Sequence, residues 1–180
     1  MIREHLPVLQ VVLPLVAAPL CLLLARSVWA WLLAFMASLA ALVISIVLLR
    51  EVYTGEVLSY AIGGWAAPWG IEYRVDILNA FVLVLVSGIG AVVATWSPAS
   101  ISVELPRYER HYLFYCAYLL CLAGLLGITV TDDMFNVFVF LEISALSSYV
   151  LISMGQHRRA LTAAYSFLIM GTLGATFILI

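Results

Sequence analysis

Residues 133–144 read Asp-Met-Phe-Asn-Val-Phe-Val-Phe-Leu-Glu-Ile-Ser, an apolar run that carries one carboxylate, Glu142, in its interior. The run lies in a longer apolar segment, residues 134–154, of which Glu142 is the ninth residue. At about 1.5 Å of rise per residue, Glu142 lies roughly 12 Å from the start of such a helix, too deep for its carboxylate to reach water. A charged side chain at the centre of a bilayer costs about 2.5–3.5 kcal/mol on insertion scales. The pattern predicts a transmembrane helix and makes Glu142 the first candidate functional residue.

The composition of the whole chain is that of a membrane protein. Of its 180 residues, 66% are hydrophobic and 10% are charged, whereas soluble domains are about 45–50% apolar and about 25% charged. The net charge of −2 lacks the basic character of a nucleic-acid-binding protein. We therefore expect a lipid bilayer as the environment and no nucleic acid as a partner.

Nothing in the sequence predicts a cofactor or a metal site. The three cysteines, Cys21, Cys116 and Cys121, each lie in an apolar stretch and form no Cys-X-X-Cys pair. Such cysteines are typical of small buried side chains. The sequence also has no phosphate-binding loop, dinucleotide fingerprint, His-Glu-X-X-His motif or nucleophile elbow. We therefore expect no cofactor and no metal site in this chain.

Six apolar segments are long enough to cross a bilayer, because about 20 helical residues span its core. We predict an all-α, polytopic transmembrane helix bundle that forms a single membrane domain over residues 1–180. The expected helices are 6–25, 28–49, 77–96, 112–131, 134–154 and 161–180. The third is expected to stop at Ser97-Pro98, since proline removes a helical donor. Small residues spaced three or four apart predict close packing of the last three helices: Gly124, Gly127, Ser144, Ser148, Gly171, Gly174 and Ala175.

The longest connection between expected helices covers residues 50–76. Its two ends, 57–62 and 71–75, read as short strands, and the residues between them are rich in Gly, Pro and Trp. This pattern predicts a β-hairpin with a longer loop, lying at the membrane surface. An irregular cap over the helix ends is the alternative.

The arginines predict the orientation in the membrane. If the helices alternate in direction, one face carries five arginines and the other carries three. The five are Arg26, Arg107, Arg110, Arg158 and Arg159, and the three are Arg3, Arg50 and Arg74. The positive-inside rule then places loops 97–111 and 155–160 in the cytoplasm, and the N-terminus and the hairpin outside.

The chain offers Glu142 no cation inside the membrane. It contains no Lys, and every Arg and His lies at or near the end of an apolar segment. Burial favours the protonated form of a carboxylate, and a nearby cation favours the ionised form. A movable cation from another helix or subunit would therefore make Glu142 a switchable proton carrier. The alternative is a protonated side chain that hydrogen-bonds to a neighbouring helix as a packing contact.

Two further polar residues are candidates for a proton path to Glu142. Asp133, at the start of the helix, suits the mouth of such a path, although capping and the helix dipole also explain an acidic residue there. Ser144, two residues further along, is a candidate for holding ordered water near the carboxylate.

Three stretches of the chain resemble a known family. The first is residues 133–154, with Phe-Val-Phe-Leu-Glu-Ile-Ser at 138–144; the second is residues 63–76, which begin Gly-Gly-Trp; the third is residues 158–177, which begin Arg-Arg-Ala-Leu-Thr. Together they span most of residues 63–180. They are similar to the proton-conducting, antiporter-like membrane subunits. These include the D subunit of the multisubunit Mrp-type Na+/H+ antiporter and the large membrane subunits of respiratory complex I and of membrane-bound hydrogenases.

The resemblance implies that Glu142 corresponds to the family's fifth-helix glutamate, which takes part in coupled ion translocation. Many relatives carry a Lys early in the sixth helix, and Ser166 holds that position here, which makes Ser166 a third candidate for the proton path. The family's chains usually have about fourteen helices. The resemblance therefore predicts that residues 1–180 are the N-terminal part of a longer subunit; the alternative is a split subunit completed by a second polypeptide.

The function that the resemblance implies is proton translocation within a hetero-oligomeric Na+/H+ antiporter of the bacterial inner membrane. Protons, a monovalent cation (Na+) and the other antiporter subunits are the expected partners. One alternative is an antiporter-like subunit of a redox-driven proton pump, either an NADH-quinone oxidoreductase or a membrane-bound hydrogenase. A second alternative is a structural membrane scaffold in which Glu142 only packs.

Overall fold

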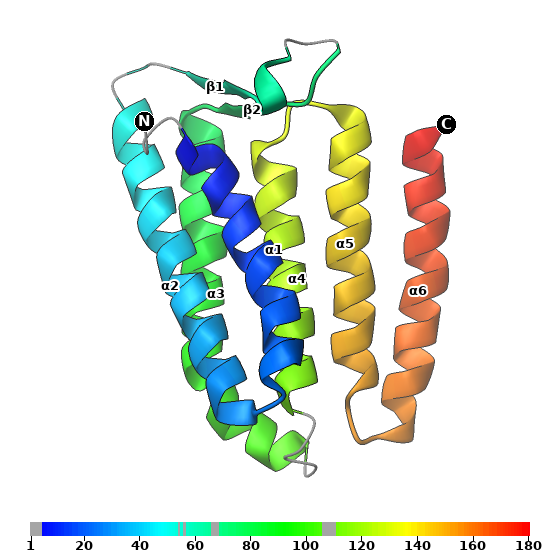
Figure 1. Cartoon of the computed structure of the whole chain (residues 1–180). Coiled ribbons are helices and arrows are strands. Elements are labelled where there is room, and N and C mark those ends of the chain that lie inside the picture. The colour runs from blue at the N-terminus through cyan, green and yellow to red at the C-terminus, as the bar shows by residue number, and fades with distance from the viewer. Residues whose placement is uncertain (1–4, 54, 56, 66–68, 106–110) are drawn as a thin grey trace.

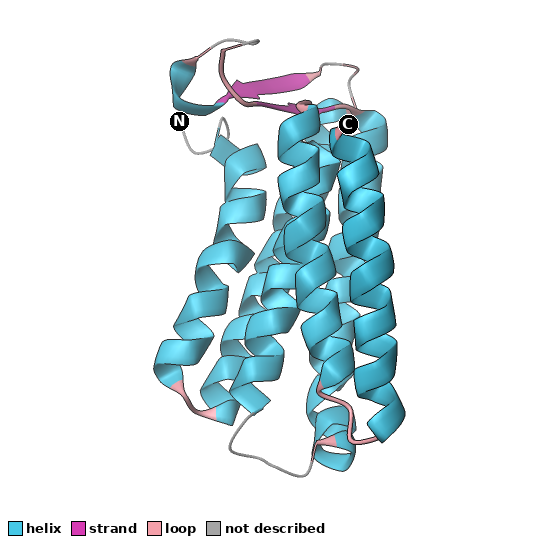
Figure 2. Ribbon diagram, turned by 90° about the vertical axis from the view of Figure 1, so that its right-hand side faces the viewer, coloured by secondary structure: helices cyan, strands magenta, loops and turns pink. Residues whose placement is uncertain are grey.

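The computed structural model describes residues 5–53, 55, 57–65, 69–105 and 111–180, which form a helix bundle with a hairpin across one end (Figures 1 and 2). Its elements are α1 (Leu6–Leu24), α2 (Ser27–Val52), β1 (Leu58–Ala61), β2 (Glu72–Val75), α3 (Ile77–Glu104), α4 (His111–Val130), α5 (Met134–Ser153) and α6 (Arg158–Leu179). Among the described residues, six helices are long and apolar enough to cross a membrane. The predicted all-α transmembrane bundle is confirmed.

Helix α4 lies at the centre of the arrangement. It packs against α1, α2, α3 and α5, whereas α6 packs mainly against α5. Figure 1 shows α5 and α6 extending in turn from one side of the α1–α4 group. The helix that carries Glu142 therefore lies between the main bundle and an edge helix.

Small residues bring α4 and α5 close together, as their spacing predicted. A Cβ atom on Gly124 would lie 2.7 Å from the Cβ of Ser144 and 2.8 Å from the carbonyl oxygen of Phe140. At Gly127 an added Cβ would collide with the Phe140 ring. The α4–α5 contact therefore depends on glycine, because any side chain at these two positions would push the helices apart.

The third helix does not stop at Pro98, so that prediction was wrong. Helix α3 continues to Glu104, with Pro98 inside it. Proline has no backbone N–H, which leaves the carbonyl of Ala94 without its helical donor. Two side chains replace that donor: the Ser97 hydroxyl at 2.9 Å and the Trp31 indole nitrogen of α2 at 3.0 Å. The helix continues because its freed carbonyl is satisfied from outside the backbone ladder.

The predicted hairpin between α2 and α3 is confirmed as an antiparallel pair of strands. Leu58 pairs with Val75 and Ala61 pairs with Glu72. Gly63 and Gly64, in the turn that follows β1, have φ angles of 71° and 76°, a left-handed conformation that favours glycine. Figure 2 shows the two strands lying across the ends of the helices. The side of the membrane on which the hairpin lies stays a prediction.

The described arginines separate between the two ends of the bundle, as alternating helices require. Arg50 and Arg74 lie at the hairpin end, and Arg26, Arg158 and Arg159 lie at the opposite end (Figure 1). The other arginines used to predict the orientation, Arg3, Arg107 and Arg110, lie outside the described residues. The positive-inside orientation therefore stays a prediction.

Candidate functional site

The start of α5 is held by side-chain caps. The Asp133 carboxylate accepts a hydrogen bond from the backbone N–H of Asn136 at 2.9 Å, which is the expected capping role. The Asn136 amide in turn donates to the Thr131 hydroxyl at 2.9 Å. These contacts set where α5 begins, and so they set the depth of Glu142 within it. A role for Asp133 in a proton path stays a prediction.

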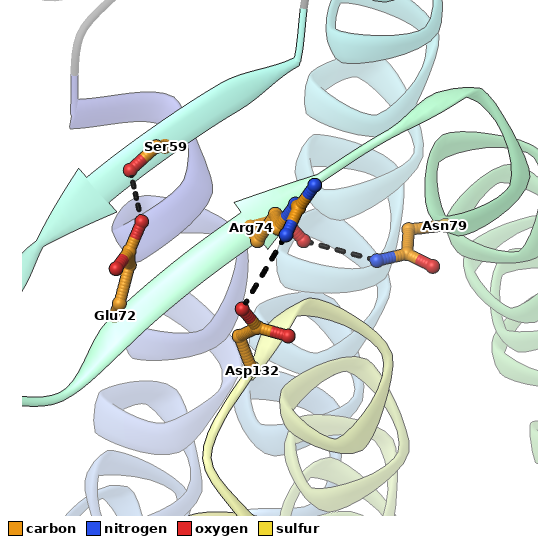
Figure 3. Close-up of polar contacts among 5 residues, drawn as sticks. All are labelled: Ser59, Glu72, Arg74, Asn79 and Asp132. Atoms are coloured by element: carbon orange, nitrogen blue, oxygen red, sulfur yellow. Dashed lines mark hydrogen bonds and ion pairs between the residues drawn. The ribbon is translucent and has the colours of Figure 1, made fainter. Parts of the chain in front are cut away.

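The β1–β2 hairpin also holds the segment just before α5, residues 131 and 132. Tyr73 forms a β-bridge with Thr131, and the backbone N–H of Asp132 donates to the carbonyl of Glu72 at 3.2 Å. Arg74 lies 3.8 Å from the Asp132 carboxylate, with both side chains about half exposed. Figure 3 shows this ion pair, together with the Asn79 amide that donates to the Arg74 carbonyl at 3.0 Å. The hairpin thus holds the α4–α5 connection in place, and it is called the strap below.

Tyr73 is the buried centre of this strap. It is 5% exposed, and burial raises the pKa of its hydroxyl, while a hydrogen bond with Asn136 lowers it. Burial is the larger of the two effects. The hydroxyl therefore stays neutral at ordinary pH and joins the hairpin to the first turn of α5.

Glu142 lies near the middle of α5 and is half-buried. Within the described residues its carboxylate has no hydrogen-bond or ion-pair partner. Seven residues separate it from Tyr149, which places the two on the same side of the helix, about two turns apart. Tyr149 contacts Phe167 of α6, with ring centroids 5.6 Å apart, and its hydroxyl lies against Gly171. Glu142 therefore lies on the side of α5 that faces α6.

Ser144 lies on a different side of the helix from Glu142. It is buried against Gly124 of α4, and its hydroxyl donates to the Leu141 carbonyl at 2.9 Å. Two residues turn an α-helix by about 200°, so Ser144 and Glu142 point in nearly opposite directions. The structure assigns Ser144 to the α4–α5 packing contact.

Ser166 lies on the far side of α6 from α5. Among the α6 side chains that the structure describes, those of Ala164 and Ala175 are buried, whereas Ser166 is exposed. Ser166 follows Ala164 by two residues, which again corresponds to a rotation of about 200°. The structure thus brings none of Asp133, Ser144 and Ser166 into contact with Glu142. Their part in a proton path stays a prediction.

Sequence reasoning missed Tyr149, the polar side chain that shares the Glu142 face of α5. The seven-residue spacing was a signal for it. Spacing alone does not reveal that α6 covers this face, because that depends on how α5 is rotated against its neighbours. As to metals, the described residues contain no group of three or more His, Cys, Asp or Glu side chains that could hold an ion.

The sequence has relatives among both antiporter and oxidoreductase subunits, although no family model matches it. The N subunit of the NADH-quinone oxidoreductase of Desulforudis audaxviator is 40% identical over 98% of this chain, and the match covers 35% of that protein. The D subunit of the Na+/H+ antiporter of Alkalihalophilus pseudofirmus is 33% identical over 71% of this chain and 25% of that protein. The chain thus spans about a third, or less, of the length of these relatives.

Two solved structures share the fold. A chain of the Mrp complex from Dietzia sp. has a TM-score of 0.85 and 23% identity, and the match covers 98% of this chain and 33% of that one. A chain of an archaeal membrane-bound sulfane sulfur reductase has a TM-score of 0.86 and 25% identity over 96% of this chain and 35% of that one. By sequence and by fold, the chain belongs to the superfamily of antiporter-like membrane subunits, which Na+/H+ antiporters share with NADH-quinone oxidoreductases.

Proposed function

We propose that this chain is part of the proton-translocating membrane subunit of a multisubunit Na+/H+ antiporter. Glu142 is the group that takes up and releases the proton. The observation that carries the proposal is the position of Glu142: mid-helix, half-buried and without a hydrogen-bond or ion-pair partner among the described residues. Ionisable residues at such a depth are costly, and they mark ion pathways in membrane proteins.

The proposed mechanism couples the proton to a cation that approaches and leaves. An apolar surrounding favours protonated Glu142, and an approaching cation favours its ionised form and releases the proton. No described Lys, Arg or His of this chain lies within ion-pair distance of Glu142. We propose that a further helix of the subunit or a neighbouring subunit supplies the cation.

Hetero-oligomeric assembly is part of the proposal. The Mrp complex and the sulfane sulfur reductase, whose chains share this fold, are membrane complexes. The choice of an antiporter, and of Na+ as the cation, rests on the similarity to the D subunit of a Na+/H+ antiporter. We place the protein in the bacterial plasma membrane with its N-terminus outside, following the arginine distribution of the whole sequence.

A redox-driven proton pump is the second candidate, and the 40% identity to an NADH-quinone oxidoreductase subunit favours it. Glu142 would take up and release protons there in the same way, because both complexes need a carboxylate that carries protons within the membrane. The genes beside this one discriminate the two. Other antiporter subunits indicate the antiporter, and flavin or iron–sulfur subunits indicate the pump.

The test is cation-dependent proton flux in vesicles that contain the assembled complex. Glu142→Gln keeps the size of the side chain and removes its ability to carry a proton, so we expect flux to be lost while assembly persists. Glu104→Gln, at the end of α3, is the matched control and should leave flux intact. Unchanged flux in Glu142→Gln would instead favour a structural scaffold. Flux that requires an electron donor and ignores Na+ would favour the redox pump.

A further inference from the structure

An apolar groove lies beside α4 at the end of the bundle away from the hairpin. Its volume is about 960 Å³, which is at the upper end of the range for ligand sites, about 300–1,000 Å³. Ala117 and Leu120 of α4 form its floor, Leu22 of α1 forms one wall, and Leu146 and Val150 of α5 form the other. The groove exists because α1 and α5 both pack on α4, one on each side of it.

The groove opens toward the bilayer at membrane depth. Leu146 and Val150 are 48% and 49% exposed, although both lie inside the transmembrane helix α5. The apolar lining at this depth suits an acyl chain, and the charge near the end of the groove is what distinguishes a lipid from another helix as its occupant.

Three exposed arginines lie close in the chain to residues that line this end of the groove. Gln156 is one of the lining residues, and the exposed Arg158 and Arg159 follow it within three residues. On the opposite wall, the exposed Arg26 follows Leu22 by four residues. The α1–α2 and α5–α6 connections that carry these arginines lie at the same end of the bundle (Figure 1). In the part of the chain that the structure describes, none of the three guanidinium groups pairs with a carboxylate.

We propose that this groove is a binding site for an anionic phospholipid. One acyl chain lies along Ala117 and Leu120, and Arg158, Arg159 and Arg26 bind the headgroup phosphate. Guanidinium groups match phosphate oxygens in geometry as well as in charge. Arginines at the end of an apolar cleft between transmembrane helices are the arrangement that selects acidic headgroups. This inference does not depend on the role of Glu142.

The test is native mass spectrometry of the full chain in mild detergent, with phosphatidylglycerol or phosphatidylcholine of identical acyl chains. We expect wild type to retain phosphatidylglycerol preferentially. Each arginine near a headgroup contributes about a fivefold preference, so Arg158→Gln with Arg159→Gln should reduce retention by roughly twenty-fivefold. Arg50→Gln, an exposed arginine at the hairpin end, is the control and should change little. Equal retention of the two lipids by wild type would overturn the proposal.

A second pair of variants tests the groove itself. Val150→Trp fills the groove, whereas Val92→Trp places the same bulk on an exposed position of α3 outside it. Loss of the retained lipid in Val150→Trp alone supports the site. Equal loss in both variants would assign the lipid to the general bilayer shell. Unchanged lipid retention with an altered oligomeric state in Val150→Trp would assign the groove to a protein contact, and either result would refute the lipid site.

Discussion

The indole nitrogen of Trp31 donates a hydrogen bond to the carbonyl oxygen of Ala94 at 3.0 Å, and thereby joins α2 to α3 one turn before Pro98. The contact satisfies the acceptor that Pro98 leaves without its helical partner. A side chain on one helix thus supports the backbone of another.

This hydrogen bond predicts that the stability cost of replacing Trp31 depends on whether residue 98 is proline. Trp31→Phe should destabilise the protein by about 0.5–1.5 kcal/mol through the lost hydrogen bond, in addition to the loss in packing. In a Pro98→Ala background the cost should be smaller, because the alanine restores a backbone N–H to the Ala94 carbonyl. A double-mutant cycle from thermal unfolding in detergent measures this coupling. The exposed Trp29→Phe is the control, and strictly additive effects would contradict the explanation.

The glycines of α4 and α6 should differ sharply in their tolerance of alanine. Gly124→Ala places a Cβ atom 2.7 Å from the backbone nitrogen of Ser144, so it should cost about 1–3 kcal/mol by overpacking. Gly174 has nothing within 4 Å of an added Cβ, and Gly174→Ala should be neutral or slightly stabilising. Unfolding midpoints of the two variants check this. Equal effects would mean that α4 and α5 are not in tight contact.

Substitutions of Asp133 can distinguish its capping of α5 from a role in the proton path. Asp133→Ala removes the acceptor for the Asn136 N–H and should cost about 0.5–2 kcal/mol, whereas Asp133→Asn keeps an acceptor and should preserve stability. The asparagine carries no exchangeable acidic proton. Normal stability with normal proton flux in Asp133→Asn would limit Asp133 to capping, and normal stability with reduced flux would establish it in the proton path.

The strap formed by the hairpin should loosen in alkali. Burial raises the pKa of the Tyr73 hydroxyl above its ordinary value of about 10. A raised pKa means that the folded protein holds the proton more tightly than the unfolded chain does. The stabilisation from neutral Tyr73 is therefore complete below a pH of about 10, and it is lost as the pH rises through the higher folded value.

Fluorescence of Trp65 and Trp69, which are exposed between the two strands, should report this loosening when wild type is compared with Tyr73→Phe. Wild type should show an alkaline transition that the phenylalanine variant lacks. An identical transition in both proteins would assign it to another group.

The candidate site was predictable in part. The depth of Glu142, and the lack of a cation beside it among the described residues, both follow from local order along the chain. The Asp133 cap follows from its place before an apolar run. The positions of Ser144 and Ser166 did not follow, because they depend on which neighbour each helical face meets. Tyr149 shares the face of Glu142, and only the packing of α6 revealed what covers that face.

By itself, the sequence determined the number of membrane spans, the two strands of the hairpin and the isolation of one carboxylate. Each of these depends on hydropathy, turn residues or charge over a short stretch, and these properties act locally. Only the tertiary structure decided that α3 passes through Pro98, that the hairpin is tied to the start of α5, and that Glu142 faces α6. These features depend on donors and surfaces supplied by residues distant in the chain, such as Trp31 for Ala94. A short stretch of sequence cannot show which distant group it will contact.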